Sequence, residues 1–301
     1  MSQLTRNGVD LSRILRCPTC LRGSVSCTPS AVTCVACGAT FDVRHGVPVM
    51  LDPVFSRELL DALAGSRAWE DYDSQRINPT VAKHSARRPS LWQRLRPSVR
   101  VQVGPTFRQF LGKYDIRGLV LEIGGGPKSL DVPGAVNMDV NAYQGVDVIG
   151  DARRMPFLDS VFQGLISNSV LEHIWEVQLV ADECHRVTAR DGFLFMCVPQ
   201  VCGRHHTVDY WRWTIPGLVR LFNRFTVVDS GPILGPAMFV HQAAGNAVAA
   251  AIAFRPLAKL AVLVLEWLLM PVRFLDRLGS GRAEQVNYAH TIYIVGQKGV
   301  E

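Results

Sequence analysis

Short, continuous apolar runs alternate with more polar stretches between residues 116 and 230. Parallel strands that are covered on both faces produce such runs, so the pattern predicts an open α/β sheet. A helix is expected over residues 177–187, and another over 215–222 with Thr214 as its N-cap. The predicted strands are 119–122, 135–139, 146–149, 163–167, 193–198, 225–230 and 290–296.

Acidic side chains follow three successive predicted strands. Glu122 ends the first strand and precedes a glycine turn, Asp139 ends the second, and Asp151 with Ala152 follows the third. A glycine turn between a strand and a helix lets backbone N–H groups approach a ligand without interference from a Cβ atom. The glycines are Gly124, Gly125 and Gly126.

This series resembles the class I S-adenosylmethionine-dependent methyltransferases, in particular their type 11 group, over residues 116–230 and the last strand. The resemblance implies a Rossmann-like sheet of six parallel strands and one antiparallel strand. It also implies that Glu122 and the glycines hold the methionine part of the cofactor, Asp139 the ribose, and Asp151 with Ala152 the adenine. Residues 155–162 and 167–174, which include Asn168 as a further cofactor contact, also look like this family. Gln163 departs from the family pattern, in which an Asp is usual at this position. The competing interpretation of the three acidic strand ends is a nicotinamide-binding Rossmann domain.

Four of the eight cysteines form two Cys-x-x-Cys pairs, Cys17 with Cys20 and Cys34 with Cys37. Two such pairs can place four thiolates around one zinc ion, and the alternative, a pair of disulfides, is disfavoured in a cytosolic chain. A four-thiolate site leaves no open coordination position, so the predicted zinc is structural. Residues 11–52 resemble the small zinc-ribbon proteins that activate tRNA and protein methyltransferases.

The segment that follows the ribbon is basic. No acidic residue occurs from Ser74 to Tyr114, where nine Lys and Arg residues accompany Trp92. This connector, residues 53–115, is expected to be helical; it is either a solvated face or a basic lid for an anionic acceptor. The basic residues are Arg76, Lys83, Arg87, Arg88, Arg94, Arg96, Arg100, Arg108 and Lys113.

A second cluster of functional residue types follows the fifth predicted strand, at the sheet edge where α/β folds bind ligands. Residues 209–214 resemble the Asp-Tyr-Trp-Arg-aromatic-Thr motif of type 11 methyltransferases that act on cell-surface polysaccharides and glycolipids. The alternative is a structural corner in which Trp and Arg stack. Methyl transfer to a hydroxyl needs a base, and the candidates are His205, His206, Asp209 and His173, with a slight preference for His206.

Residues 231–287 interrupt the last two strands with an apolar helical insertion. Its apolar stretches, 243–254 and 257–270, are broken by Arg255, Pro256, Lys259 and Glu266, which argues against a membrane-spanning helix. On a helix, Arg255, Lys259, Glu266, Arg273 and Arg277 form one narrow stripe, with a kink expected at Pro271. The insertion therefore either packs against protein or lies, through residues 243–277, on an anionic membrane surface.

Length and composition support a large domain with a small one. The 301 residues carry a formal net charge of +6, are 48% hydrophobic, and begin without an apolar leader. We divide the chain into a ribbon (11–52), a connector (53–115) and a methyltransferase domain (116–301), and expect a cytoplasmic protein with peripheral membrane attachment as an option. The favoured acceptor is a sugar hydroxyl of a glycan or lipid-linked glycan. RNA, suggested by the ribbon and the connector, is second, and a non-catalytic cofactor-binding adaptor is third.

Overall fold

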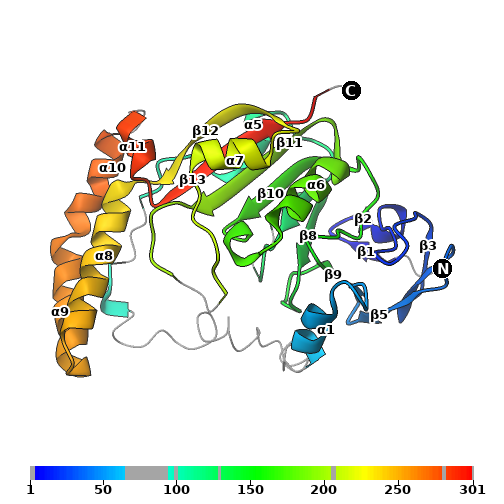
Figure 1. Ribbon diagram of the computed structural model, residues 1–301, viewed down its shortest axis with the longest axis horizontal. Coiled ribbons are helices and arrows are strands. Elements are labelled where there is room, and N and C mark those ends of the chain that lie inside the picture. The colour runs from blue at the N-terminus through cyan, green and yellow to red at the C-terminus, as the bar shows by residue number, and fades with distance from the viewer. Residues whose placement is uncertain are drawn as a thin grey trace.

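The fold is built on one eleven-stranded sheet, which the computed structural model describes together with its flanking helices (Figure 1). The described residues are 4–64, 94–97, 101–127, 130–204, 208–279 and 283–299. Seven strands form the Rossmann-like part, in the order β12-β13-β11-β10-β7-β8-β9. Their bounds are β7 Val120–Ile123, β8 Ala135–Asp139, β9 Val148–Gly150, β10 Phe162–Asn168, β11 Thr188–Pro199, β12 Thr226–Leu234 and β13 Thr291–Gln297.

The strand directions confirm the predicted fold class. β7, β8, β9, β10 and β11 pair in parallel, whereas β13 is antiparallel to both β11 and β12. The sheet part therefore has six parallel strands and one antiparallel strand. Its centre is apolar on both faces, and Leu121, Leu165 and Leu194 are fully buried.

Local signals set the helices of this part. Thr214 caps α7 (Ile215–Leu221) by accepting a hydrogen bond from Gly217 N at 3.2 Å, as predicted. α6 (Val177–Val187) has the predicted bounds. α5 (Phe107–Lys113) begins with a capping box in which Thr106 and Gln109 bond each other's backbone N–H. The remaining short element is η2 (Leu171–His173).

The contacts of Gln163 explain why a Gln can stand at a position where an Asp was expected. Its Oε1 accepts hydrogen bonds from the backbone N–H groups of Arg117 (2.8 Å) and Gly118 (2.6 Å), just before β7. An amide oxygen satisfies these two donors as a carboxylate oxygen would.

The N-terminal ribbon extends the same sheet. Its last strand, β6, pairs in parallel with β9, so that Val49 lies opposite Ile149. Leu15 forms an isolated antiparallel bridge with Phe157, and the two residues share one buried cluster. The ribbon and the Rossmann-like part thus share a sheet and a core. Its elements are β1 Thr5–Arg6, β2 Val9–Asp10, η1 Leu11–Arg13, β3 Val25–Cys27, β4 Ala31–Cys34, β5 Thr40–Arg44 and β6 Val47–Met50, followed by α1 Arg57–Ala64.

The apolar insertion forms a helical hairpin at the opposite end of the sheet from the ribbon (Figure 1). β12 runs to Leu234, beyond its predicted end at residue 230, because it continues to pair with β13. Pro271 lies in a 3₁₀ segment rather than a continuous α-helix, in line with the predicted kink. None of the helices described is both long and apolar enough to cross a membrane. The elements are α8 Pro236–Ala251, α9 Arg255–Leu268, η3 Met270–Phe274, α10 Leu275–Leu278 and α11 Ala283–Asn287.

Candidate functional site

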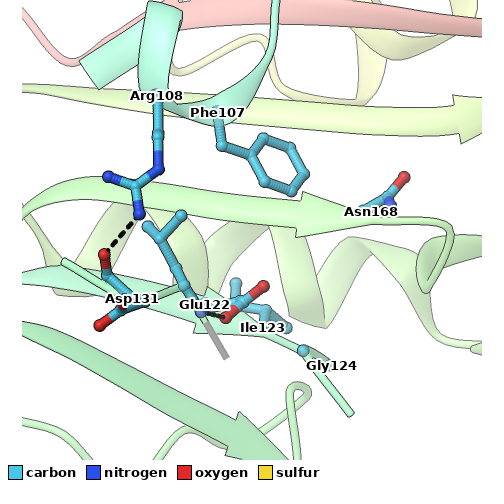
Figure 2. Close-up of a pocket in the computed structure, with 9 residues that line it drawn as sticks. Phe107, Arg108, Glu122, Ile123, Gly124, Asp131 and Asn168 are labelled. Atoms are coloured by element: carbon cyan, nitrogen blue, oxygen red, sulfur yellow. Dashed lines mark hydrogen bonds between the residues drawn. The ribbon is translucent and has the colours of Figure 1, made fainter. Parts of the chain in front are cut away.

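A cavity of about 470 Å³ opens where β7 and β10 end. Figure 2 shows Glu122 and Gly124 at the end of β7, Asn168 at the end of β10, and Phe107 and Arg108 reaching in from α5. This is the carboxyl edge of the sheet, where open α/β folds bind ligands. The volume is in the usual range for a site that takes a cofactor-sized molecule.

The glycine turn is shaped by steric need. A Cβ atom at Gly125 would lie 2.6 Å from Glu122 Cδ and 2.6 Å from Asn137 Oδ1, and one at Gly124 would lie 2.4 Å from Val170 Cγ2. Gly124 and Gly126 also have positive φ angles of 68° and 58°. The turn therefore holds its backbone against the end of β7 in a way that no side chain at Gly124 or Gly125 would permit.

Two buried carboxyl groups lie at this site: Glu122 in the cavity lining, and Asp139 behind the glycine turn. Burial raises the pKa of Glu122, the N–H of Leu130 opposes the rise, and the charges of Asp139 and Asp147 add to it. Burial likewise raises the pKa of Asp139, against hydrogen bonds from Asn141 N (2.9 Å) and Gly126 N (3.0 Å). Carboxyls that repel one another favour a ligand that carries positive charge.

The third predicted acid, Asp151, is strongly engaged within the protein. It accepts hydrogen bonds from Ser56 Oγ (2.8 Å) and pairs with the guanidinium of Arg153 (2.8 Å). Arg153 also pairs with Glu58 in α1 and with Glu176. Asp151 therefore ties the segment after the ribbon to the end of β9, and the buried Ala152 beside it stays a predicted adenine contact.

Five residues that line the cavity were not among the predicted site residues: Phe107, Arg108, Ile123, Leu130 and Asp131. Arg108 donates to the backbone oxygen of Asp131 at 2.8 Å (Figure 2). It is the one cation among the described residues of the lining, so it can pair with a ligand carboxylate. The Thr106-x-x-Gln109 capping box was a usable sequence signal for this helix, although it does not reveal that the helix covers the cavity.

The predicted acceptor loop is fixed by Arg212. Its guanidinium pairs with both oxygens of the buried Asp209, at 2.5 and 2.8 Å, and donates to the backbone oxygens of Cys202 and Gly203. Asp209 is thus a partner that orients Arg212. The Arg212 contacts are hydrogen bonds and an ion pair, and they join residues 202–203 to residues 209–212.

Aromatic rings form an exposed surface beside this loop. Trp175 stacks on Trp211 with ring centroids 5.2 Å apart and an interplanar angle of 22°, and Tyr210 meets Trp175 edge-on at 5.5 Å. Trp211 Nε1 donates to Ile174 O, which fixes the stack. Trp175 is 61% exposed and Tyr210 51% exposed. We call Trp175, Tyr210 and Trp211 the aromatic platform.

Of the candidate bases, His173 and Asp209 lie in the described part of the chain, whereas His205 and His206 lie outside it. His173 Nδ1 is 2.5 Å from the carbonyl oxygen of Val208, to which it donates, and its Nε2 is 3.7 Å from Glu172. Glu172, which the sequence did not single out, is fully buried. Burial raises its pKa to about 7, Asp209 adds to the rise, and Arg212 opposes it.

The four predicted zinc ligands come together in the ribbon. Their Sγ atoms all lie within 4.8 Å of one another, with Cys17 to Cys37 at 3.8 Å and Cys20 to Cys34 at 3.6 Å. Zinc–sulfur bonds of about 2.3 Å in a tetrahedron give sulfur–sulfur edges of about 3.8 Å, so the cluster fits a structural zinc ion. Each Cys-x-x-Cys pair closes with a turn, by Leu21 N to Cys17 O and Gly38 N to Cys34 O, both at 3.0 Å.

One segment of the chain matches a known protein family. Residues 131–196 match the family model described as a methyltransferase domain. A sequence comparison with curated proteins finds no match.

Solved structures give remote likenesses. The 1,6-didemethyltoxoflavin-N1-methyltransferase of Burkholderia thailandensis is 13% identical, with 88% of this chain and 98% of that chain covered and a TM-score of 0.42. The phosphoethanolamine N-methyltransferase 2 of Haemonchus contortus is 12% identical, with 63% of this chain and 51% of that chain covered and a TM-score of 0.38. A chain from the complex between the Haloferax volcanii Trm112 methyltransferase activator and a methyltransferase is 14% identical. The match covers 81% of this chain and 98% of that chain, with a TM-score of 0.40.

The strand order and the family match together identify a class I methyltransferase domain that uses S-adenosylmethionine. The chain therefore contains a methyltransferase domain, and its sheet is extended by an N-terminal four-cysteine ribbon.

Proposed function

We propose that this methyltransferase methylates a sugar hydroxyl of a cell-surface glycan or glycolipid. The aromatic platform is the observation that supports this acceptor. The apolar face of a pyranose ring packs well on exposed aromatic rings, and Trp175 and Tyr210 offer such rings with little further surface to desolvate. Trp175 lies on the segment that follows β10, whose last residue, Asn168, lines the cavity, whereas Tyr210 and Trp211 lie on the loop after β11.

The cofactor side of the proposal assigns the cavity to S-adenosylmethionine, which supplies an electrophilic methyl group for in-line displacement. Glu122 and the glycine turn are proposed to hold its methionine part, Asp139 its ribose, and Asp151 with Ala152 its adenine. Arg108 is proposed to pair with its carboxylate. Asn168 is proposed to line the cofactor near the acceptor. We also keep the division into ribbon, connector and methyltransferase domain as proposed boundaries.

The proposed base is a histidine of the acceptor loop, His206 or His205. Asp209 is buried in its ion pair with Arg212, and the Nδ1 atom of His173 is bonded to Val208 O. Both contacts favour a role in holding the loop over a role in accepting the hydroxyl proton. Arg212 joins residues 202–203 to residue 209, on either side of the segment that carries the two histidines.

The RNA alternative gains no support from the described part of the connector. Arg96 pairs with Glu266, Arg108 donates to Asp131 O, and Lys113 pairs with Asp229 at 2.6 Å. These three cations are engaged within the chain, whereas Arg94 is exposed. Arg76, Lys83, Arg87, Arg88, Trp92 and Arg100 lie outside the described residues.

Removing the platform tests the acceptor. With a glycolipid fraction of cell extract as acceptor, Trp175→Ala is expected to raise the acceptor KM roughly tenfold, since an aromatic contact contributes about 1–2 kcal/mol. Its affinity for S-adenosylmethionine should not change. Val228→Ala, at an exposed site on β12, is the control and should behave as wild type. An unchanged KM in Trp175→Ala would refute the platform as the acceptor site.

A further inference from the structure

The helical hairpin turns an apolar stripe outward. Leu257, Leu260, Val264, Trp267 and Leu268 of α9, with Phe254 just before it, are 49–70% exposed. Their spacing of three and four residues places them on one side of the helix. We call these six residues the outer stripe. Single exposed apolar residues are ordinary on a protein surface, but a contiguous stripe along a helix marks an interaction surface.

Three polar side chains of the hairpin point inward. Glu266, Arg273 and His241 are 7%, 6% and 3% exposed. Arg273 Nη2 lies 2.9 Å from His241 Nε2, and that nitrogen lies 3.1 Å from the backbone oxygen of Glu266. The guanidinium of Arg96, from residues 94–97 beside the hairpin, pairs with both carboxylate oxygens of Glu266.

This arrangement is the reverse of an amphipathic helix packed on a protein core. The sequence predicted a polar stripe of five residues, and the structure buries two of them, Glu266 and Arg273. The other three members of the stripe are exposed: Arg255, Lys259 and Arg277. The apolar side is left on the outside, where the hairpin stands away from the sheet (Figure 1). The polar cluster stabilises the hairpin from its inner side. Within the outer stripe, Trp267 Nε1 donates to Leu95 O at 2.7 Å, and Trp267 is still 51% exposed.

The charges of the hairpin select among possible partners. Residues 236–279 carry two acids, Glu266 and Asp276, and both are buried. Asp276 accepts the N–H of Ala237 at 2.9 Å, at the start of α8. The exposed charges of this segment, Arg255, Lys259 and Arg277, are all cationic. A second copy of the hairpin would bring like charges together, whereas an anionic bilayer attracts them.

We propose that the α8–α9 hairpin docks this methyltransferase on an anionic phospholipid surface. α9 would lie in the plane of the interface, with the outer stripe among the upper acyl chains and Arg255 and Lys259 at the headgroups. Its fourteen residues correspond to roughly 21 Å at about 1.5 Å per residue, too short for a hydrocarbon core of about 30 Å. Docking of this kind is peripheral, and it is independent of the identity of the methyl acceptor.

Vesicle co-sedimentation of the full chain tests the proposal. We expect binding to vesicles of mixed phosphatidylcholine and phosphatidylglycerol, weaker binding to phosphatidylcholine alone, and a decline with added salt. Val264→Asp should lower the partition coefficient at least about tenfold, since it replaces buried apolar surface with a charge. Val219→Asp is the matched control, because Val219 is an exposed valine of α7, and it should bind as wild type.

The charge contribution is measured separately. Arg255→Gln and Lys259→Gln should each weaken binding to the anionic vesicles about fivefold and leave binding to phosphatidylcholine unchanged. Failure of the wild type to sediment with the anionic vesicles would overturn the proposal, as would equal binding by Val264→Asp. Sedimentation velocity tests the alternative that the outer stripe binds a second copy of the chain. The proposal would also be overturned if the wild type formed a dimer that Val264→Asp dissociates and did not bind vesicles.

Discussion

The shared core of the ribbon and the Rossmann-like part predicts that the two unfold together. Leu15 is 1% exposed and lies opposite Phe157, which is fully buried. Leu15→Ala removes three buried carbon atoms from the shared core, which costs about 3–4 kcal/mol. At roughly 2–4 °C per kcal/mol for a domain of this size, the single calorimetric transition should fall by about 6–16 °C.

The control for this prediction is Leu21→Ala in the same ribbon. Leu21 is 43% exposed, so its truncation should change the transition temperature by no more than about 2 °C. Removing zinc with a chelator should lower the same transition, because the four thiols then no longer hold the ribbon in place. Two separate transitions, with only the lower one sensitive to Leu15→Ala or to the chelator, would show that the shared core does not couple the two parts.

Two further predictions concern the cavity and the buried carboxyl behind the acceptor loop. Gly125→Ala should weaken S-adenosylmethionine binding at least about tenfold by calorimetry, since its Cβ would clash with Glu122, whereas Gly112→Ala, with nothing within 4 Å, should bind normally. Because the pKa of Glu172 is raised to about 7, the folded state binds its proton more tightly than the unfolded state, so stability should fall as pH rises from about 4.5 through 7. Denaturant unfolding should show a flatter pH profile in Glu172→Gln; identical profiles in the two proteins would contradict this assignment.

Local signals in the sequence predicted much of the sheet. β8 and α6 have the predicted bounds, and Thr214 caps α7 as expected, because apolar runs and capping residues act within a few positions. The alternation of apolar and polar stretches was enough to predict the fold class, which the strand directions confirm. The four cysteines also converge as predicted, since the spacing within each pair limits how they can be arranged.

Contacts between distant segments were the part that the sequence did not reveal. The pairing of β6 with β9 joins the ribbon to the sheet through a register that neither segment specifies alone. The raised pKa of Glu172 results from its burial next to the acceptor loop. The identity of a residue does not reveal how deeply it is buried. The inward direction of Glu266 depends on Arg96, 170 positions away. Phe107 and Arg108 reach the cavity for the same reason, through the packing of α5 across strands that come later in the chain.

Transfer of labelled methyl from S-adenosylmethionine into fractionated cell extract tests the central claim most directly, with Asp139→Ala as the cofactor-site control. The account predicts label in the glycan or glycolipid fraction with wild-type protein and a loss of that label with Asp139→Ala. Label in RNA would contradict the proposed acceptor and favour the basic connector as an RNA-binding segment. Cofactor binding without label in any fraction would contradict catalysis and favour an adaptor.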